Sequence, residues 1–259
     1  MSQPKIITSK SGSIFRITIN RPSKKNAVDS ETYKLLIENL ALADKDDDIS
    51  MTVITGVGDF FSSGNEFSAS KIKNIAEDPK SATTLVQQFV DALIGHSKVL
   101  IGLVNGPAIG IACTTLALFD CVVCTDDAYF SCPFTKLGLL PEGTSSLSFP
   151  LIMGHSKAAQ MLLFSEKMSA NEAKQAGLVN IVIPRQLFKA ESEKILQKYA
   201  QLMPQSLLKA KQLMRTQQQR HLLHSANQQE IEAIQHQWIQ PETSRNVQKA
   251  FSKPNTSKI

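Results

Sequence analysis

Apolar and polar positions alternate in a regular way over the first half of the chain. Short apolar runs bounded by glycine, proline or acidic turns predict strands, and the first two form a hairpin around Gly12. Segments with apolar residues at helical spacing lie between these runs, one of them capped by Asp29 or Ser30. The predicted strands are residues 6–8, 14–19, 51–55, 99–104, 121–125 and 128–131. One predicted helix begins at residue 30, and two more cover residues 80–94 and 110–118. Repeated strand–helix units of this kind predict an α/β fold.

The pattern changes at residue 145, after which only helical periodicity is evident. The last third therefore is expected not to continue the sheet, and Pro204 and Pro241 are read as breaks between helices. The predicted helices are 156–164, 170–175, 186–201, 205–218 and 221–239. Because no low-complexity linker is present, we expect one α/β core over residues 1–200. A helical region over residues 201–259 should pack on it or form an oligomer interface.

The amino-acid composition favours a folded protein and argues against disordered, membrane-spanning and nucleic-acid-binding classes. Of the 259 residues 42% are hydrophobic and 20% are charged, which predicts a folded chain with a sizeable core. No apolar run reaches the 18 residues of a membrane helix and the start lacks an apolar signal core, so we expect a soluble protein without membrane insertion. The net charge of +5 comes without a basic block interleaved with aromatic residues. It therefore favours a phosphate-bearing small molecule over nucleic acid.

One carboxylate stands out as a candidate for proton transfer. Glu142 follows Phe134, Leu137 and two further leucines, and burial among apolar side chains raises the pKa of a carboxyl towards neutrality. The alternative is structural, because Glu142 could also cap the helix that follows it. The pattern alone leaves both interpretations open.

Two glycine-containing loops could supply backbone N–H groups to an anion. One is Ser63-Gly64-Asn65, and the other runs from a buried strand through Gly110 into a helix that begins near Ile111. Helix N-termini stabilise a developing negative charge. An ordinary turn and close helix–strand packing are the alternatives for these loops.

Other catalytic classes lack their usual signatures. Ser145 and Ser146 do not lie in a nucleophile elbow, and neither a P-loop nor a dinucleotide-binding glycine motif is present. The histidines of the last long helix, His221, His224 and His236, have no evident partner and are interpreted as surface residues. The four cysteines are interpreted as small core residues, and no metal site is expected.

With these segments assembled, the chain resembles the crotonase (enoyl-CoA hydratase/isomerase) superfamily. The matching stretches are Asn20-Arg21-Pro22, Asn26-Ala27, Ser63-Gly64-Asn65, residues 105–110 and residues 173–179. Within the superfamily it is most similar to the peroxisomal-type Δ3,Δ2-enoyl-CoA isomerases, through residues 62–65, Phe119-Asp120 and residues 140–143. The order and spacing of these stretches carry the resemblance, since no single one is specific.

The resemblance implies a crotonase-type spiral of ββα units with a helical C-terminal trimerisation region, assembled as a homotrimer or a dimer of trimers. It implies an acyl-CoA thioester substrate and no separate cofactor, because coenzyme A is part of the substrate. The amides of Asn65 and Ile111 would form the oxyanion hole. Implied substrate and CoA contacts are Lys24, Ala27, Ser63, Gly64, Phe67, Ser68, Ala69, Ser70, Lys71, Gly110, Phe134 and Leu137, with Lys25 as an alternative phosphate contact.

Departures from the hydratase pattern indicate the reaction. The two glutamates that hydratases use to activate water fall at Thr114 and Phe134, whereas the isomerase glutamate is present as Glu142. The resemblance therefore implies a Δ3,Δ2-enoyl-CoA isomerase of fatty acid β-oxidation, in which Glu142 moves a proton from C2 to C4. A non-catalytic acyl-CoA-binding or scaffold homologue remains an alternative, as do dienoyl-CoA isomerisation and weak hydration.

The chain ends in Ser257-Lys258-Ile259, a variant of the S-K-L peroxisomal signal. It predicts peroxisomal localisation through binding to an import receptor. A mitochondrial or cytosolic location is the alternative.

Overall fold

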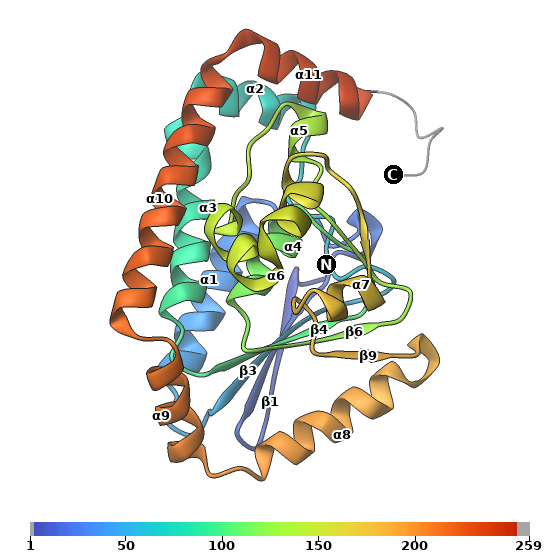
Figure 1. The fold of residues 1–259 in the computed structure, drawn as a ribbon, viewed down its shortest axis with the longest axis vertical. Helices are drawn as coiled ribbons and strands as arrows, with labels where there is room; N and C mark the ends of the chain where they lie inside the picture. Colours follow the sequence, from blue (N-terminus) through green and yellow to red (C-terminus); the bar gives the residue numbers. More distant parts are fainter. Residues whose placement is uncertain (1–2, 253–259) are drawn as a thin grey trace.

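A computed structural model describes residues 3–252, with the side chains of Ala69, Phe251 and Ser252 left out of the description. The C-terminal Ser257-Lys258-Ile259 lies outside the described residues. Within them, the protein contains a six-stranded sheet, a three-stranded sheet and helices on several sides (Figure 1).

The larger sheet has the strand order β1-β2-β3-β4-β6-β9. Its first two strands form the predicted antiparallel hairpin, and every later pair is parallel. Its strands are β1 Ile6–Ser11, β2 Ile14–Ile19, β3 Met51–Gly56, β4 Val99–Val104, β6 Cys121–Thr125 and β9 Ile181–Ile183. The smaller sheet pairs β7 Tyr129–Ser131 with β5 Ala108–Ile109 and β8 Met168–Ser169.

Helices make up most of the remaining structure. The α-helices are α1 Ser30–Lys45, α2 Ala69–Glu77, α3 Pro79–Gly95, α4 Ile111–Thr114, α5 Phe134–Leu137, α6 Ser145–Leu162, α7 Ala170–Gln175, α8 Phe188–Ala200, α9 Pro204–Met214, α10 Gln217–Ile239 and α11 Pro241–Ser252. Short 3-10 turns are Pro22–Lys24, Thr115–Leu118 and Arg185–Leu187. None of the helices in residues 3–252 is both long enough and apolar enough to cross a bilayer.

The core lies on both faces of the large sheet. Successive residues of β4 point to opposite faces, so Leu100 joins a cluster with α1, α3 and α6 while Ile101 joins a second cluster with Phe188 and Leu196 of α8. Helices α1, α3 and α10 lie side by side along one flank of the molecule, and α8 lies beneath the sheet (Figure 1). Burial on both faces explains why the central strands are continuous apolar runs.

Local signals account for several helix boundaries. The Asp29 side chain accepts a hydrogen bond from the Thr32 amide and caps α1. Of the two predicted caps, Asp29 and Ser30, the structure therefore shows Asp29. Pro204 and Pro241 lie at breaks between helices, as predicted, and each occupies the first position of the helix that follows, where a proline needs no amide hydrogen.

Three expectations about the elements were wrong. The last third does continue the sheet, because β9 pairs with β6 at its edge. The segment 110–118 is not one helix, since α4 ends at Thr114 and a 3-10 turn follows. Helix α6 begins at Ser145 and not at 156, and it kinks at Gly154, whose φ is +77°.

Candidate active site

A cleft with a volume of about 1830 Å³ opens at the carboxyl ends of the central parallel strands. The loops that follow β2, β3 and β4 line one side of it, and α2, α3, α10 and residues 133–142 line the others. Ligands of α/β proteins commonly bind at such a strand end. The cleft is therefore the candidate active site.

Most of the residues expected at the site line this cleft. They are Lys24, Ala27, Ser63, Asn65, Phe67, Lys71, Gly110, Phe134, Leu137 and Glu142. Its described lining does not include Gly64, Ser68, Ser70 or the side chain of Ile111, which is buried in the core. Ser68 instead caps α2 by accepting the Lys71 amide at 3.3 Å, and Ala69 begins that helix. These residues border the cleft without forming its surface.

Glu142 lies in the loop between α5 and α6 and faces the cleft. Its Oε1 and Oε2 accept the Asn65 side-chain amide at 3.0 and 3.3 Å, and no described cation forms an ion pair with it. Burial raises the pKa of Glu142 to about 8, the negative charge of Glu230 adds to the rise, and the Asn65 hydrogen bond opposes it. The carboxyl can therefore take up and release a proton near neutral pH.

Tyr33 of α1 fixes the orientation of the Asn65 side chain. Its hydroxyl donates to Asn65 Oδ1 at 2.6 Å, which leaves the Asn65 amide nitrogen facing Glu142. Burial, with the nearby charge of Glu142, raises the pKa of Tyr33 well above 10, so the hydroxyl keeps its proton. No feature of the sequence indicates this role, because Tyr33 lies among the apolar residues of an amphipathic helix and is read as a core residue.

The two glycine-containing loops lie side by side. Ser62 N–H donates to Pro107 O at 3.3 Å, and Ile109 N–H donates to Ser62 O at 3.0 Å. A Cβ on Gly64 would lie 2.5 Å from Ile109 O, so this close approach requires glycine.

Each loop presents a free amide directly after a glycine of positive φ, +82° at Gly64 and +58° at Gly110. Over residues 3–252, the backbone N–H groups of Asn65 and Ile111 have no acceptor. Asn65 and Gly110 both line the cleft. Two unpaired donors from adjacent loops are suited to binding one oxygen atom that carries negative charge.

Thr114 and Phe134, the two positions at which the resemblance places hydratase glutamates, carry no acid. Phe134 lines the cleft as an apolar wall. Thr114 is fully buried and packs so closely against the loop that carries Glu142 that a Cβ on Gly143 would lie 2.5 Å from its Oγ1. The space between Thr114 and Gly143 is therefore filled.

The cleft also has a basic rim. Five lysines contribute to its lining, two of them adjacent in one turn: Lys24, Lys25, Lys71, Lys136 and Lys167. Burial lowers the pKa of Lys71. Lys25 Nζ lies 5.1 Å from the centre of the Phe60 ring, which positions the ammonium group at the rim. Such a rim suits a ligand that carries phosphates.

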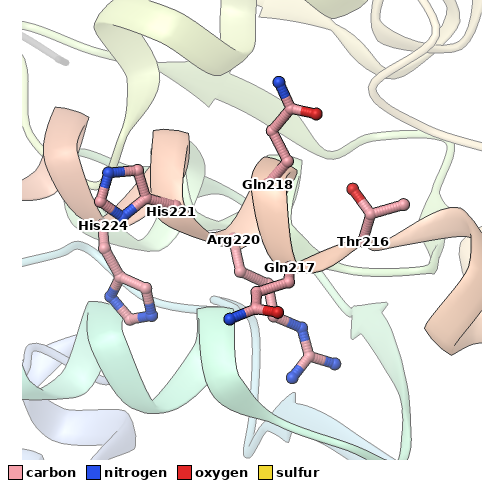
Figure 2. Close-up of a pocket in the computed structure, with 6 residues that line it drawn as sticks. All are labelled: Thr216, Gln217, Gln218, Arg220, His221 and His224. Atoms are coloured by element: carbon pink, nitrogen blue, oxygen red, sulfur yellow. The ribbon is translucent and has the colours of Figure 1, made fainter.

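A second, shallow hollow of about 840 Å³ lies at the start of α10 (Figure 2). Gln218 and Arg220, which contribute to its lining, point to opposite sides of the helix (Figure 2). His224 was expected to have no partner, but its Nδ1 lies 2.7 Å from Asp91 Oδ1. Across the described residues, no three His, Cys, Asp or Glu side chains form a group that could hold a metal ion. Among the described residues, the hollow and the cleft share no lining side chain.

A sequence model of the enoyl-CoA hydratase/isomerase family matches residues 9–253. The chain belongs to this family. Human enoyl-CoA delta isomerase 2 is 41% identical over 245 residues, which are 93% of this chain and 61% of the relative. Mouse "Enoyl-CoA delta isomerase 3, peroxisomal" is 40% identical over 235 residues, 88% of this chain and 72% of the relative. The chain thus spans less than two thirds of the length of the human relative.

Solved structures of family members share the fold. An enoyl-CoA hydratase/isomerase from Pseudoalteromonas atlantica superposes with a TM-score of 0.87 at 32% identity, covering 98% of this chain and all of the other. The resemblance to the crotonase superfamily and its α/β fold is therefore confirmed. The family includes both hydratases and isomerases, so the arrangement of the site must decide between them.

Proposed function

We propose that the protein is a Δ3,Δ2-enoyl-CoA isomerase that shifts the double bond of a 3-enoyl-CoA to the trans-2 position, in the β-oxidation of unsaturated fatty acids. The observation that carries the proposal is that Glu142 lines the same cleft as two loops with unpaired backbone amides, those of Asn65 and Ile111. Glu142 is also the one acid among the three positions at which the resemblance places the hydratase and isomerase glutamates. Its relatives named enoyl-CoA delta isomerase support the same reaction.

Binding would align the thioester with the two glycine loops. The amides of Asn65 and Ile111 would donate to the carbonyl oxygen, and each such donor is worth about 3–4 kcal/mol when charge develops there. Phosphates of coenzyme A would contact the lysine rim at Lys24 or Lys25. Coenzyme A would be part of the substrate, so no separate cofactor is needed.

Proton transfer would then require only one carboxylate. In a 3-enoyl thioester the C2 protons lie between a carbonyl and a double bond, so their removal gives a conjugated dienolate. Glu142 would take the C2 proton and return it at C4, and its pKa of about 8 is close to the working pH of a general base. The Asn65 side chain, fixed by Tyr33, would hold the carboxylate in place.

Hydration would be inefficient at this site. Water attack in a hydratase needs a second acid, and Thr114 and Phe134 cannot provide one. Phe134 and Leu137 would also exclude water from the reacting carbons. This favours isomerisation over hydration.

A direct assay tests the proposal. Wild type, Glu142→Gln and the control Glu77→Gln, whose carboxylate lies at the cleft rim beside Lys73, would be incubated with 3-hexenoyl-CoA. We expect conversion to 2-hexenoyl-CoA by wild type and control, and at least a thousandfold loss of kcat in Glu142→Gln. Full activity of Glu142→Gln would refute the mechanism. Acyl-CoA binding by wild type without turnover would support the scaffold alternative instead.

The assembly and location of the protein are part of the proposal. Large apolar side chains are exposed on α6 and α9, among them Leu151, Leu213 and Met214, and favour a homotrimer or a dimer of trimers. Light scattering that gives a monomer at micromolar concentration would exclude this assembly. The mouse relative's name and the Ser257-Lys258-Ile259 ending favour import into peroxisomes. Unchanged localisation after deletion of these three residues would contradict the role of the signal.

A further inference from the structure

Helix α10 contributes a second buried carboxylate next to the proposed active site, and the mechanism above does not use it. Glu230 is 6% exposed. Its Oε2 accepts the Thr144 amide at 2.7 Å and its Oε1 accepts the Ser146 amide at 2.8 Å. Both amides belong to the turn that follows Glu142, although Glu230 lies more than 80 residues further along the chain.

This turn has an unfavourable backbone conformation and lacks a cap of its own. Gly143 and Thr144 have successive positive φ angles of +72° and +65°, and the second is unfavourable for a residue with a branched side chain. Thr144 is the N-cap of α6, yet its side chain makes no capping hydrogen bond and the first turn of α6 contains no acidic residue. Glu230 supplies the missing acceptor from another helix.

The same contacts reach Glu142 through the backbone. The Ser145 hydroxyl donates to Glu142 O at 2.8 Å, so the residue between the two amides held by Glu230 also fixes the main chain of Glu142. Thr144 and Ser145 are fully buried, which leaves the turn little room to move. We propose that Glu230 is a positioning residue for the proposed base: its carboxylate clamps the turn that presents Glu142 and places a second negative charge behind it.

The charge has a consequence separate from the clamp. Like charges disfavour each other's ionisation, and the charge of Glu230 contributes to the raised pKa of Glu142. Burial raises the pKa of Glu230 as well, while its two amide donors oppose the rise. The other titratable groups around Glu142 are Tyr33 from α1, which stays protonated, and Cys132, whose thiol pKa is raised by burial and by neighbouring Cys113. Glu230 is thus the group that adds negative charge next to the base.

The proposal rests on the isomerase function, and its test separates the two. Glu230→Gln keeps the shape of the side chain and removes the charge, and Glu232→Gln is the matched control on the exposed side of α10, where Glu232 accepts from Gln228. The measurements are the pH dependence of kcat/KM with 3-hexenoyl-CoA and the ¹³C titration of the Glu142 carboxyl in protein labelled at the glutamate side-chain carbons. The Glu142 signal is assigned by its absence in Glu142→Gln.

For Glu230→Gln we expect the acid limb of kcat/KM and the Glu142 titration to move to lower pH together, by roughly half a unit or more. The plateau rate should fall severalfold because the clamp is weakened. Glu232→Gln should match wild type in both measurements. If Glu230→Gln does not fold, Glu230→Asp keeps the charge and should keep the acid limb near its wild-type position while lowering the plateau.

An unmoved ¹³C titration in Glu230→Gln would overturn the proposal, whether or not the protein is an isomerase. A shifted titration in a protein without isomerase activity would instead leave Glu230 as a positioning residue and reject the proposed reaction. The titration does not depend on turnover, so the two failures are distinguishable.

Discussion

Replacement of Glu142 by glutamine should make the folded protein less sensitive to alkaline pH. The pKa of Glu142 is raised from 4.5 to about 8 in the folded protein, because burial disfavours the charged carboxylate. Between these values the folded chain binds one proton more than the unfolded chain, so stability falls as the pH rises. The stabilising contribution of the neutral carboxyl is complete below pH 4.5 and is lost as the pH passes 8.

The size of the effect follows from the same two pKa values. At 1.36 kcal/mol for each pKa unit, the wild-type chain would lose about 4 kcal/mol of stability between pH 5 and pH 9 through this group. Water in the open cleft reduces the figure, so we expect about 2–4 kcal/mol. Glutamine does not titrate, so the variant should not lose this stability. The difference in free energy of unfolding, Glu142→Gln minus wild type, should therefore rise by about 2–4 kcal/mol from pH 5 to pH 9.

Urea unfolding of both proteins at pH 5, 7 and 9, at one protein concentration, measures this difference. Glu77→Gln is the control, since the exposed Glu77 should give a difference that changes little with pH. An equal difference between wild type and Glu142→Gln at pH 5 and pH 9 would refute the reasoning. It would mean that the carboxyl titrates as an ordinary glutamate and is ionised at neutral pH.

Further substitutions test other parts of the site. Tyr33→Phe removes the hydroxyl that orients the Asn65 side chain towards Glu142. It should lower kcat by about tenfold with little change in KM, measured by steady-state kinetics. The pair Lys24→Ala and Lys25→Ala should raise KM for the CoA substrate severalfold with kcat unchanged, and salt should weaken wild-type binding more than binding by the variant. Thr114→Glu should not create a hydratase. It places a carboxylate in fully buried space, and should lower the free energy of unfolding by about 3 kcal/mol, measured in urea, with no gain in hydration of 2-enoyl-CoA.

The central strands were predictable because both of their faces are buried, which makes each one a continuous apolar run. Strand β9 was not, since Ile181–Ile183 is only three residues long and becomes a strand through pairing with β6, far away in the sequence. Helix α2 lacked a clear signal for a similar reason: its apolar residue Ile72 is buried against Trp238 of α10. Short elements depend on partners that periodicity does not reveal.

The resemblance to the family, the position of Glu142, the two glycine loops and the lack of acids at Thr114 and Phe134 can all be read from the amino-acid sequence. Each of these is read from residue type and order within a short segment. The folded arrangement of the chain was needed to show that Glu142 is a half-buried carboxyl facing Asn65, that Thr144 is the N-cap of α6, and that Tyr33 and Glu230 lie around the site. The physical reason is distance along the chain: the pKa and orientation of a carboxyl depend on the dielectric, charges and donors around it, and here these come from α1, the loop after β3 and α10.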